Sequence, residues 1–429
     1  MNTYLQQRTL FAPLINNKAS INLGIIVVIP AFDEPDLLFS LMSLARCELP
    51  LVDVEVIVVI NNSEQSSEEI KARNQAIFLQ AREWAKTHNS ARLKFHLLYV
   101  PDFPAKSAGV GLARKVGMDE ACWRFMKMGN PNGIIACFDA DSRCEPNYLQ
   151  ALEDHFQAHP QSQACSIYFE HPINGIDFPD AVYEAIIPYE LHLRYYIHAQ
   201  RMAGFPYAYH TVGSSMAVKC ISYQRQGGMN KRKAGEDFYF IHKFTPLGDF
   251  TECLTTKVIP SPRPSHRVPF GTGRAVQEIL GDKGVYFTYN LHSFGDLKVL
   301  FQQVDHLFSL TSEDLSAFLL SLPQSVKQFL AEVNFENKWQ EIKMNTASVG
   351  AFRSRFFRWF NAFMLMKYVH FARDHFYPNI EIGAAAAQLL TQQSHETFAP
   401  NELKLLLKYY RQLDQQSFAT ILLDKRKGQ

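Results

Sequence analysis

The sequence has few of the features that mark several common classes of protein. Its seven cysteines are an odd number without a Cys-x-x-Cys pair, which argues against a disulfide framework or a zinc cage and fits a reducing cytosol. No run of about 18 apolar residues predicts a membrane span, and the start of the chain lacks the cationic and apolar blocks of a signal peptide. The formal net charge of +1 gives no reason to expect a nucleic-acid binder. We therefore expect a cytoplasmic protein without a nucleic-acid partner.

Two common phosphate-binding motifs are also missing. Gly109, Gly111 and Gly117 do not have the G-x-G-x-x-G spacing of a dinucleotide-binding turn, and no P-loop sequence occurs. The Rossmann dinucleotide and NTPase interpretations therefore lose their main support.

What the sequence does contain is a series of short apolar runs that alternate with helical patterns. This alternation predicts right-handed crossovers and an α/β fold with a parallel, doubly wound sheet. Pro30 is expected to end the first strand. The predicted strands span residues 23–29, 54–60, 94–100, 134–138, 164–170 and 255–259, and the main predicted helices span residues 68–88, 113–128, 147–159 and 180–201.

The length of 429 residues exceeds what one core usually serves, so we expect a large domain and an appendage. Strand signals fade after about Val276. We predict an N-terminal arm over 1–20, an α/β domain over 21–275 and a helical region over 276–429. Within the last, residues 352–377 mix aromatic and basic side chains, which suits a membrane-surface helix or, as the favoured interpretation, a helix packed against the main domain with its basic side chains reaching solvent.

The stretch IIACFDADSRC, residues 134–144, carries the clearest chemical signal. Five apolar residues end at Asp139 and Asp141, and ligands bind outside the carboxyl ends of strands in open α/β sheets. Two carboxylates so close together favour Mg²⁺ or Mn²⁺ held against substrate phosphates. The alternative is that the two carboxylates merely end the strand and cap the next helix.

Taken together, several segments resemble a family 2 glycosyltransferase of GT-A fold. The resemblance covers residues 22–274. It rests on VVIPAFDEPD, VIVVINNSE, AGVGLARKVGMDEA, FDADSRCEPNYL and the series GSSMAVK, GGM and GEDF, which occur in the order of the family. The resemblance implies a transferase that moves a sugar from a nucleotide-diphosphate donor to an acceptor hydroxyl with inversion at the anomeric carbon, and with Mn²⁺ or Mg²⁺ as cofactor.

The resemblance also implies roles for individual residues. Asp237 corresponds to the base of inverting members, with Glu236 as its neighbour, although the two could merely cap a helix. Asn61 stands where an Asp usually contacts the base, so both uracil and guanine remain open. The implied metal ligands are Asp139, Asp141 and His266, and the implied or candidate nucleotide-sugar contacts are Pro30, Phe32, Asp33, Asn61, Lys106, Arg114, Asp139, Arg263, Arg267 and Arg274.

Several alternatives stay open at this point. A retaining enzyme that makes a small glycoside and a catalytically inactive nucleotide-sugar-binding protein are both compatible with the motifs. A nucleotidyltransferase is disfavoured, because its first loop is usually basic and Gly-rich whereas Asp33, Glu34 and Asp36 make this one acidic. Tyr189, His192 and Tyr195 could line an acceptor pocket or belong to the core. The sequence leaves the acceptor undecided, which could be a saccharide, a lipid-linked molecule or a small molecule. It also leaves undecided whether the protein forms a homodimer and whether it contacts a membrane peripherally.

Overall fold

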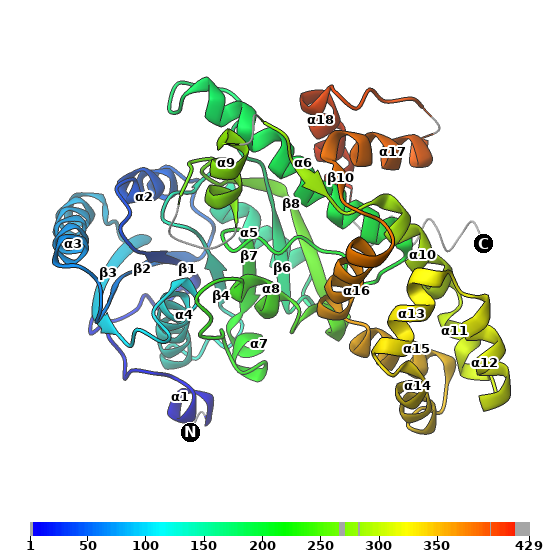
Figure 1. Cartoon of the computed structure of the whole chain (residues 1–429). Coiled ribbons are helices and arrows are strands. Elements are labelled where there is room, and N and C mark those ends of the chain that lie inside the picture. Colours follow the sequence, from blue (N-terminus) through cyan, green and yellow to red (C-terminus); the bar gives the residue numbers. More distant parts are fainter. Residues whose placement is uncertain (1–2, 266–270, 282–283, 395, 417–429) are drawn as a thin grey trace. The chain divides into compact units, whose positions relative to one another are not determined.

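The computed structural model describes residues 3–265, 271–281, 284–394 and 396–416 (Figure 1). The chain divides into two compact units. The first comprises Met1–Phe178 and Thr211–Ala275 together with Gln415–Gln429, and the second comprises Pro179–His210 and Val276–Asp414. Residues 179–210, which the sequence analysis placed in the α/β domain, therefore cluster with the C-terminal helices. None of the helices in the described part of the chain is long and apolar enough to cross a membrane.

The first unit is built on an eight-stranded mixed sheet with the order β3-β2-β1-β4-β7-β6-β8-β5. The pairs β1–β2, β2–β3, β1–β4 and β6–β8 are parallel, whereas β7 runs antiparallel to β4 and β6, and β5 runs antiparallel to β8. The predicted α/β class is confirmed. The strands are β1 (Leu23–Ala31), β2 (Asp53–Ser63), β3 (Leu93–Phe103), β4 (Ile134–Cys137), β5 (Arg143–Cys144), β6 (Ala164–Phe169), β7 (Met216–Lys219) and β8 (Phe250–Ile259).

The central strands are buried along their whole length, as their continuous apolar runs predicted. The expected strand end at Pro30 was wrong, because β1 continues to Ala31 and Pro30 pairs with Val59 of β2. The carbonyl of Val28 accepts a hydrogen bond from the N–H of Phe138, so Val28 and, two residues on, Pro30 turn their backbone polar groups away from β2. Since β4 has already ended at Cys137, the missing N–H of Pro30 interrupts no ladder.

Helix α4 packs directly on the strands that lead to the candidate site. A Cβ added to Gly117 would lie 2.4 Å from a methyl group of Val28 and 3.1 Å from one of Val59, so only glycine permits this approach of helix to sheet. The helices of the first unit are α1 (Thr3–Gln7), α2 (Leu37–Ala45), α3 (Glu68–His88), α4 (Val110–Lys127), α5 (Tyr148–Ala158), α7 (Cys220–Arg225), α8 (Glu236–Ile241) and the 3₁₀ turn η1 (Thr245–Leu247); α9 (Thr272–Gly281) spans the boundary between the units.

The second unit is helical apart from a two-stranded pairing of β9 (Phe287–Thr288) with β10 (Ile380–Glu381). Its buried side chains, among them Phe294, Leu297 and Trp339, form a core of their own. Its helices are α6 (Asp180–Ala203), α10 (Leu291–Gln302), α11 (Val304–Ser309), α12 (Ser312–Ser321), α13 (Gln324–Glu332), α14 (Phe335–Met344), α15 (Val349–Trp359), α16 (Ala362–His375), α17 (Ile382–Ser394) and α18 (Leu403–Asp414).

The aromatic and basic stretch 352–377 forms two helices, α15 and α16, and not one. Asn361 caps the second helix by accepting from the N–H groups of Phe363 and Met364. Phe352, Phe356 and the inward face of α16 are buried. Much of the apolar surface is thus used for packing within the second unit.

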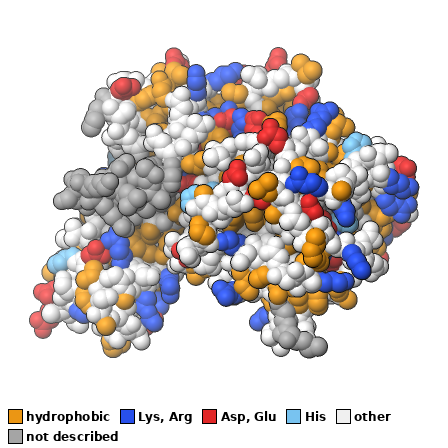
Figure 2. Space-filling model, turned by 180° about the vertical axis from the view of Figure 1, so that it is seen from behind, with side chains coloured by type: hydrophobic (Ala, Val, Ile, Leu, Met, Phe, Trp, Pro, Cys, Tyr) orange, Lys and Arg blue, Asp and Glu red, His pale blue; other side chains and the backbone are white. Residues whose placement is uncertain are grey.

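On the face shown in Figure 2, basic and acidic side chains of the described residues are interspersed.

Candidate functional site

The candidate site lies at the edge of the sheet where the parallel strands β1, β2 and β4 end. The segment after β1 supplies the acidic loop, β2 ends with Asn61 and its neighbours, and the segment after β4 supplies Asp139 and Asp141. Because parallel strands deliver their carboxyl ends to one edge, segments far apart in the sequence meet there. This edge is therefore where the predicted residues can act together.

Arg114 on α4 is the residue that joins these segments. Its guanidinium donates through Nη2 to Asp139 Oδ1 at 2.9 Å and through Nε to Glu236 Oε1 at 3.2 Å. It also donates through Nη1 to the carbonyl of Gly213 at 2.9 Å. Arg114 is 1% exposed and Glu236 is 3% exposed, whereas Asp139 keeps part of its surface in solvent. The first aspartate of the Asp-x-Asp pair and the predicted catalytic Glu-Asp pair are thus connected through one buried cation.

Gly213 leaves room for this arrangement. A Cβ added to Gly213 would lie 2.9 Å from Arg114 Nη2 and 3.2 Å from Asp237 Oδ2. The backbone at Gly213 therefore borders both the guanidinium and the proposed base. Gly213 begins the GSSMAVK segment, so the motif contributes a backbone carbonyl and space to the site.

Glu236 and Asp237 open α8, where Gly235 adopts a left-handed conformation with φ of 70°. Burial and the neighbouring Glu236 carboxylate raise the pKa of Asp237 to about 7. Burial also raises the pKa of Glu236, although the Arg114 guanidinium opposes this. Asp237 Oδ1 accepts a hydrogen bond from the N–H of Phe238 at 2.7 Å. A half-buried carboxyl group with a pKa near neutrality has the properties of a general base.

The loop after β1 is held by polar contacts with α3. Asp33 has a φ of 49°, a conformation that Asp tolerates better than most residues, and its N–H donates to Asn74 Oδ1 at 2.8 Å. Arg73 binds both carboxylate oxygens of Asp33, at 2.7 and 2.9 Å. Asn61, which is 4% exposed, donates through Nδ2 to the carbonyl of Ala31 at 2.9 Å. The side-chain donor of Asn61 thus braces the end of β1, which leaves its Oδ1 as the atom better suited to accept from a ligand.

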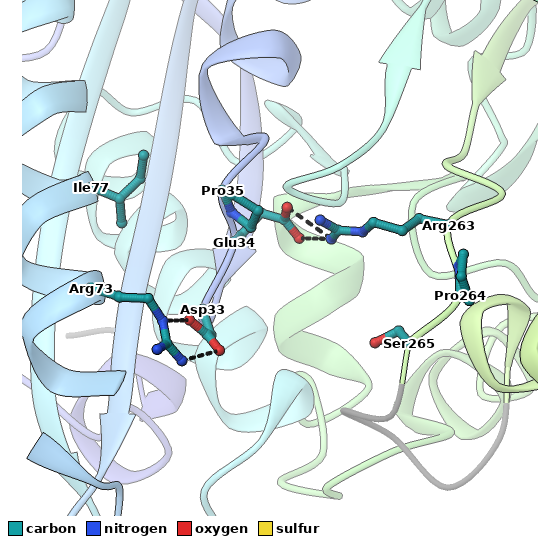
Figure 3. Close-up of a pocket in the computed structure, with 8 residues that line it drawn as sticks. All are labelled: Asp33, Glu34, Pro35, Arg73, Ile77, Arg263, Pro264 and Ser265. Atoms are coloured by element: carbon teal, nitrogen blue, oxygen red, sulfur yellow. Dashed lines mark hydrogen bonds and ion pairs between the residues drawn. The ribbon is translucent and has the colours of Figure 1, made fainter. Parts of the chain in front are cut away.

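A pocket of about 470 Å³ opens beside this loop (Figure 3). Arg263 binds both oxygens of Glu34, at 2.9 and 2.7 Å, and donates to Asp36 Oδ2 at 3.0 Å. The same guanidinium lies 3.8 Å from Asp141 Oδ2. Figure 3 shows two Arg–carboxylate pairs, Arg73 with Asp33 and Arg263 with Glu34, that both use the loop after β1. The residues that line the pocket are Asp33, Glu34, Pro35, Arg73, Ile77, Arg263, Pro264 and Ser265.

The described residues contain no group of three His, Cys, Asp or Glu side chains that could by themselves hold a metal ion. Asp139 and Asp141 nevertheless supply partly exposed carboxylate oxygens on either side of Ala140. Mg²⁺ and Mn²⁺ sites of nucleotide enzymes commonly use one or two carboxylates, with phosphate oxygens and water completing the shell. The donor set fits a cation that is bound together with a diphosphate.

The other residues predicted from the sequence differ in their placement. Pro30 is buried in β1, and Phe32 is half-buried in the loop that follows. Lys106 is exposed after β3, and Arg274 lies half-buried in the first turn of α9. His266 and Arg267 lie outside the described residues. Glu34, Arg73 and Asn74 were not predicted from the sequence to have a role in the site. The acidic character of the first loop was the available signal for the first of these, and nothing in the pattern of α3 distinguished the other two.

The aromatic side chains of α6 belong to the second unit. Tyr195 is fully buried and donates to the carbonyl of Tyr289 at 2.8 Å. His192 bonds Thr288 through Nδ1 at 2.7 Å, and burial lowers its pKa to about 4. Tyr189 packs edge-on against Tyr286. These three residues therefore take part in the packing of the second unit.

No protein-family model matches the chain, and no curated protein is similar to it in sequence. Among solved structures, the chain is similar to S. aureus TarS 1–349 in complex with UDP-GlcNAc, with 14% identity over 79% of this chain and 92% of that chain and a TM-score of 0.40. It is also similar to S. aureus TarS 1–349 in complex with UDP, with 14% identity over 95% of this chain and 92% of that chain and a TM-score of 0.37.

Proposed function

We propose that this chain is a GT-A glycosyltransferase that moves a sugar from a nucleoside-diphosphate donor to an acceptor hydroxyl, with inversion at the anomeric carbon. The observation that carries the proposal is the set of bonds from the buried Arg114 to Asp139 and to Glu236. Those contacts bring the Asp-x-Asp segment next to a carboxyl group, Asp237, whose pKa is raised to about 7. In this proposal Asp139 lies on the donor side and Asp237 is the base, and one buried guanidinium links their two segments.

On the donor side, Asp139 and Asp141 would hold a divalent cation, Mn²⁺ or Mg²⁺, jointly with the diphosphate oxygens. Such a cation neutralises the charge that develops on the leaving diphosphate. The pairing of Arg114 with Asp139 orients that carboxylate, so Asp141 is the more direct ligand in this proposal. His266 is a further candidate ligand on the basis of the sequence resemblance alone.

Arg263 is proposed as a diphosphate contact. It is placed between the acidic first loop and Asp141, and a guanidinium can bind phosphate through two parallel hydrogen bonds. Binding of an anionic donor would exchange its contact with Asp36 or Glu34 for contacts with phosphate. Lys106, Arg267 and Arg274 remain sequence-based candidates for the same role.

On the acceptor side, Asp237 takes the proton from the acceptor hydroxyl as its oxygen forms a bond to the anomeric carbon. The bond from that carbon to the diphosphate breaks in the same displacement, and the nucleoside diphosphate leaves. One displacement inverts the configuration. Glu236, which is held by Arg114, raises the pKa of Asp237 and so favours proton uptake by the base.

The first experiment compares wild type with Asp237→Asn. A thermal-shift screen with uridine and guanosine diphosphate sugars, each with and without Mn²⁺, identifies a donor, and glycan and small-molecule acceptors are then tested with it. We expect Asp237→Asn to bind the donor with unchanged affinity and to lose at least about 100-fold in transfer rate. Near-normal turnover would place the base elsewhere. Retained anomeric configuration in the product would favour the retaining mechanism, and donor binding without transfer in wild type would favour a binding protein.

A further inference from the structure

The ten residues between α7 and α8 form the segment that presents Glu236 and Asp237, here called the presenting loop (residues 226–235). Its start is a tight turn in which Gly227 and Gly228 have φ of 75° and 74°. Lys243, beyond α8, donates through Nζ to the carbonyls of Gln226 at 3.2 Å and Gly228 at 2.7 Å. A half-buried lysine beyond α8 therefore holds the start of the loop through two backbone carbonyls.

The turn at Gly228 packs against Tyr4, which belongs to the first helix of the chain. A Cβ added to Gly228 would lie 1.9 Å from the hydroxyl oxygen of Tyr4 and 2.9 Å from its Cζ. Tyr4 is 8% exposed, and its ring meets that of Tyr223 edge-on at 5.7 Å. The side chain of Tyr4 thus packs directly against the start of the presenting loop at Gly228.

Tyr4 is itself fixed by charged groups of α4. Its hydroxyl donates to Asp119 Oδ1 at 2.8 Å and accepts from Lys115 Nζ at 3.1 Å. Lys115 Nζ lies 2.9 Å from Asp119 Oδ2. Asp119 Oδ1 also accepts a hydrogen bond from the hydroxyl of Tyr223 at 2.8 Å. All four side chains are buried. A buried polar cluster in which every member has partners holds its geometry tightly, because any loosening leaves polar groups unpaired.

The middle and the end of the presenting loop rest on the same helix. A Cβ added to Gly109 would lie 2.7 Å from the Cα of Lys233, and one added to Gly111 would lie 2.4 Å from the carbonyl oxygen of Arg232. At the end of the loop, Arg114 binds Glu236. Helix α4 and its N-cap residue therefore contact the middle and the end of the loop, and the Tyr4 cluster supports its start.

We propose that Tyr4 is a positioning residue for Asp237, acting through Gly228 and the presenting loop. This inference rests on the proposed transferase function for its kinetic consequence but not for its structural one. The packing of Tyr4 against Gly228 keeps the loop against α4 and thereby keeps Asp237 at a fixed distance from the acceptor. The short helix α1 at the start of the predicted N-terminal arm thereby contributes to the positioning of Asp237.

A structural test needs no activity. Hydrogen–deuterium exchange of the full chain is measured for wild type, Tyr4→Phe and Tyr4→Ala. We expect backbone exchange across residues 226–240 to increase about threefold in Tyr4→Phe and tenfold or more in Tyr4→Ala, with unchanged exchange in β1 and β2. Should Tyr4→Ala fail to fold, Tyr4→Phe decides. Wild-type exchange over residues 226–240 in a folded variant would overturn the inference.

A kinetic test follows if the wild type transfers sugar. We expect kcat to fall about tenfold in Tyr4→Ala with the donor KM within about twofold, since misplacing a base affects turnover more than donor binding. The midpoint of the kcat–pH profile should also fall. A looser loop admits water, which lowers the desolvation cost of ionising Asp237 and therefore lowers its pKa. The charged groups that face Asp237 are Glu236, Arg114 and Asp139. A wild-type midpoint and wild-type kcat in a folded Tyr4→Ala variant would overturn the inference.

The matched control is Glu120→Gln. Glu120 also lies on α4 and also binds the N-terminal segment, through the N–H groups of Leu14 and Ile15 at 2.8 and 3.1 Å. The Glu120→Gln substitution therefore loosens the N-terminal segment without removing a member of the cluster around Tyr4. We expect its exchange over residues 226–240 and its pH midpoint to match wild type. A shift equal to that of Tyr4→Ala would show that general attachment of the N-terminal segment, and not Tyr4, is responsible. An inactive wild type would refute the transferase proposal and leave the exchange test standing.

Discussion

Arg114 Nη2 and Asp139 Oδ1 lie 2.9 Å apart, and this contact joins the first turns of a helix to the end of a sheet strand. The guanidinium is completely buried, whereas the carboxylate reaches solvent. A buried arginine of this kind is stable only with its acceptors in place, because an uncompensated charge in the interior is costly. The contact therefore fixes the Asp139 carboxylate at the edge of the sheet.

Removing the Arg114 guanidinium should destabilise the fold. We expect Arg114→Met to lower the free energy of unfolding by about 3 kcal/mol, because Glu236 is left buried without its cation. The double variant with Glu236→Gln should recover part of that loss, since no buried charge then remains at position 236. Urea unfolding at pH 7.5 measures both. Strictly additive losses in the double variant would mean that the two side chains are not coupled.

The close approach of α4 to the presenting loop gives a second prediction. We expect Gly111→Ala to destabilise the protein by about 2 kcal/mol, because its Cβ would meet the Arg232 carbonyl at 2.4 Å. Gly350 is the matched control. It is likewise the second residue of a helix, α15, and nothing lies within 4 Å of an added Cβ. Gly350→Ala should stabilise by about 0.5 kcal/mol. Equal effects of the two substitutions would exclude a steric role for Gly111.

The raised pKa of Asp237 predicts the pH dependence of stability. The folded protein holds this proton up to about pH 7, whereas an unfolded Asp releases it near its ordinary pKa of 3.8. Between these values the folded state binds more protons, so the contribution of Asp237 to stability falls as pH rises from about 4 to about 7. The full shift corresponds to about 4 kcal/mol, and solvent screening of the half-buried carboxyl group reduces this to about 2 kcal/mol. Asp237→Asn should therefore be more stable than wild type above pH 7 by about 2 kcal/mol, and equal to it near pH 4.

Urea unfolding between pH 4 and pH 8 measures this difference. The exposed Asp154 on α5 provides the control, because Asp154→Asn removes a carboxyl group that faces water. Its difference from wild type should not vary with pH. If Asp237→Asn gave the same flat profile, the carboxyl group of Asp237 would not be protonated in the folded protein at neutral pH.

The proposed cation site predicts metal-dependent binding of the donor. We expect Asp141→Ala to abolish the increase in affinity for a nucleoside diphosphate that Mn²⁺ produces in wild type, as measured by titration calorimetry with Mn²⁺ and with EDTA. In EDTA the variant should bind at least as well as wild type, because a carboxylate 3.8 Å from Arg263 has been removed. Unchanged Mn²⁺-dependent affinity would remove Asp141 from the metal site.

Much of the frame of the site could be predicted from the sequence. The runs that became β1, β2 and β4 are apolar without interruption, and a strand buried on both faces has that pattern. Asp139 and Asp141 directly follow such a run, so their position at the edge of the sheet needed no tertiary information. The short loop carrying Glu236 and Asp237 was likewise visible from its glycines.

The contacts within the site could not be predicted in this way. Arg114 and Glu236 are 122 residues apart, and whether they meet depends on how α4 packs. Gly117 permits the close packing of α4 on the strands, and Gly111 permits its close packing on the presenting loop. A local pattern states which residue types occur along an element, but it does not state which side chains from different elements share one interior. The sequence determined the strands and the two acidic pairs, and only the tertiary structure decided that one buried guanidinium connects them, because ion pairing over such separations follows from packing.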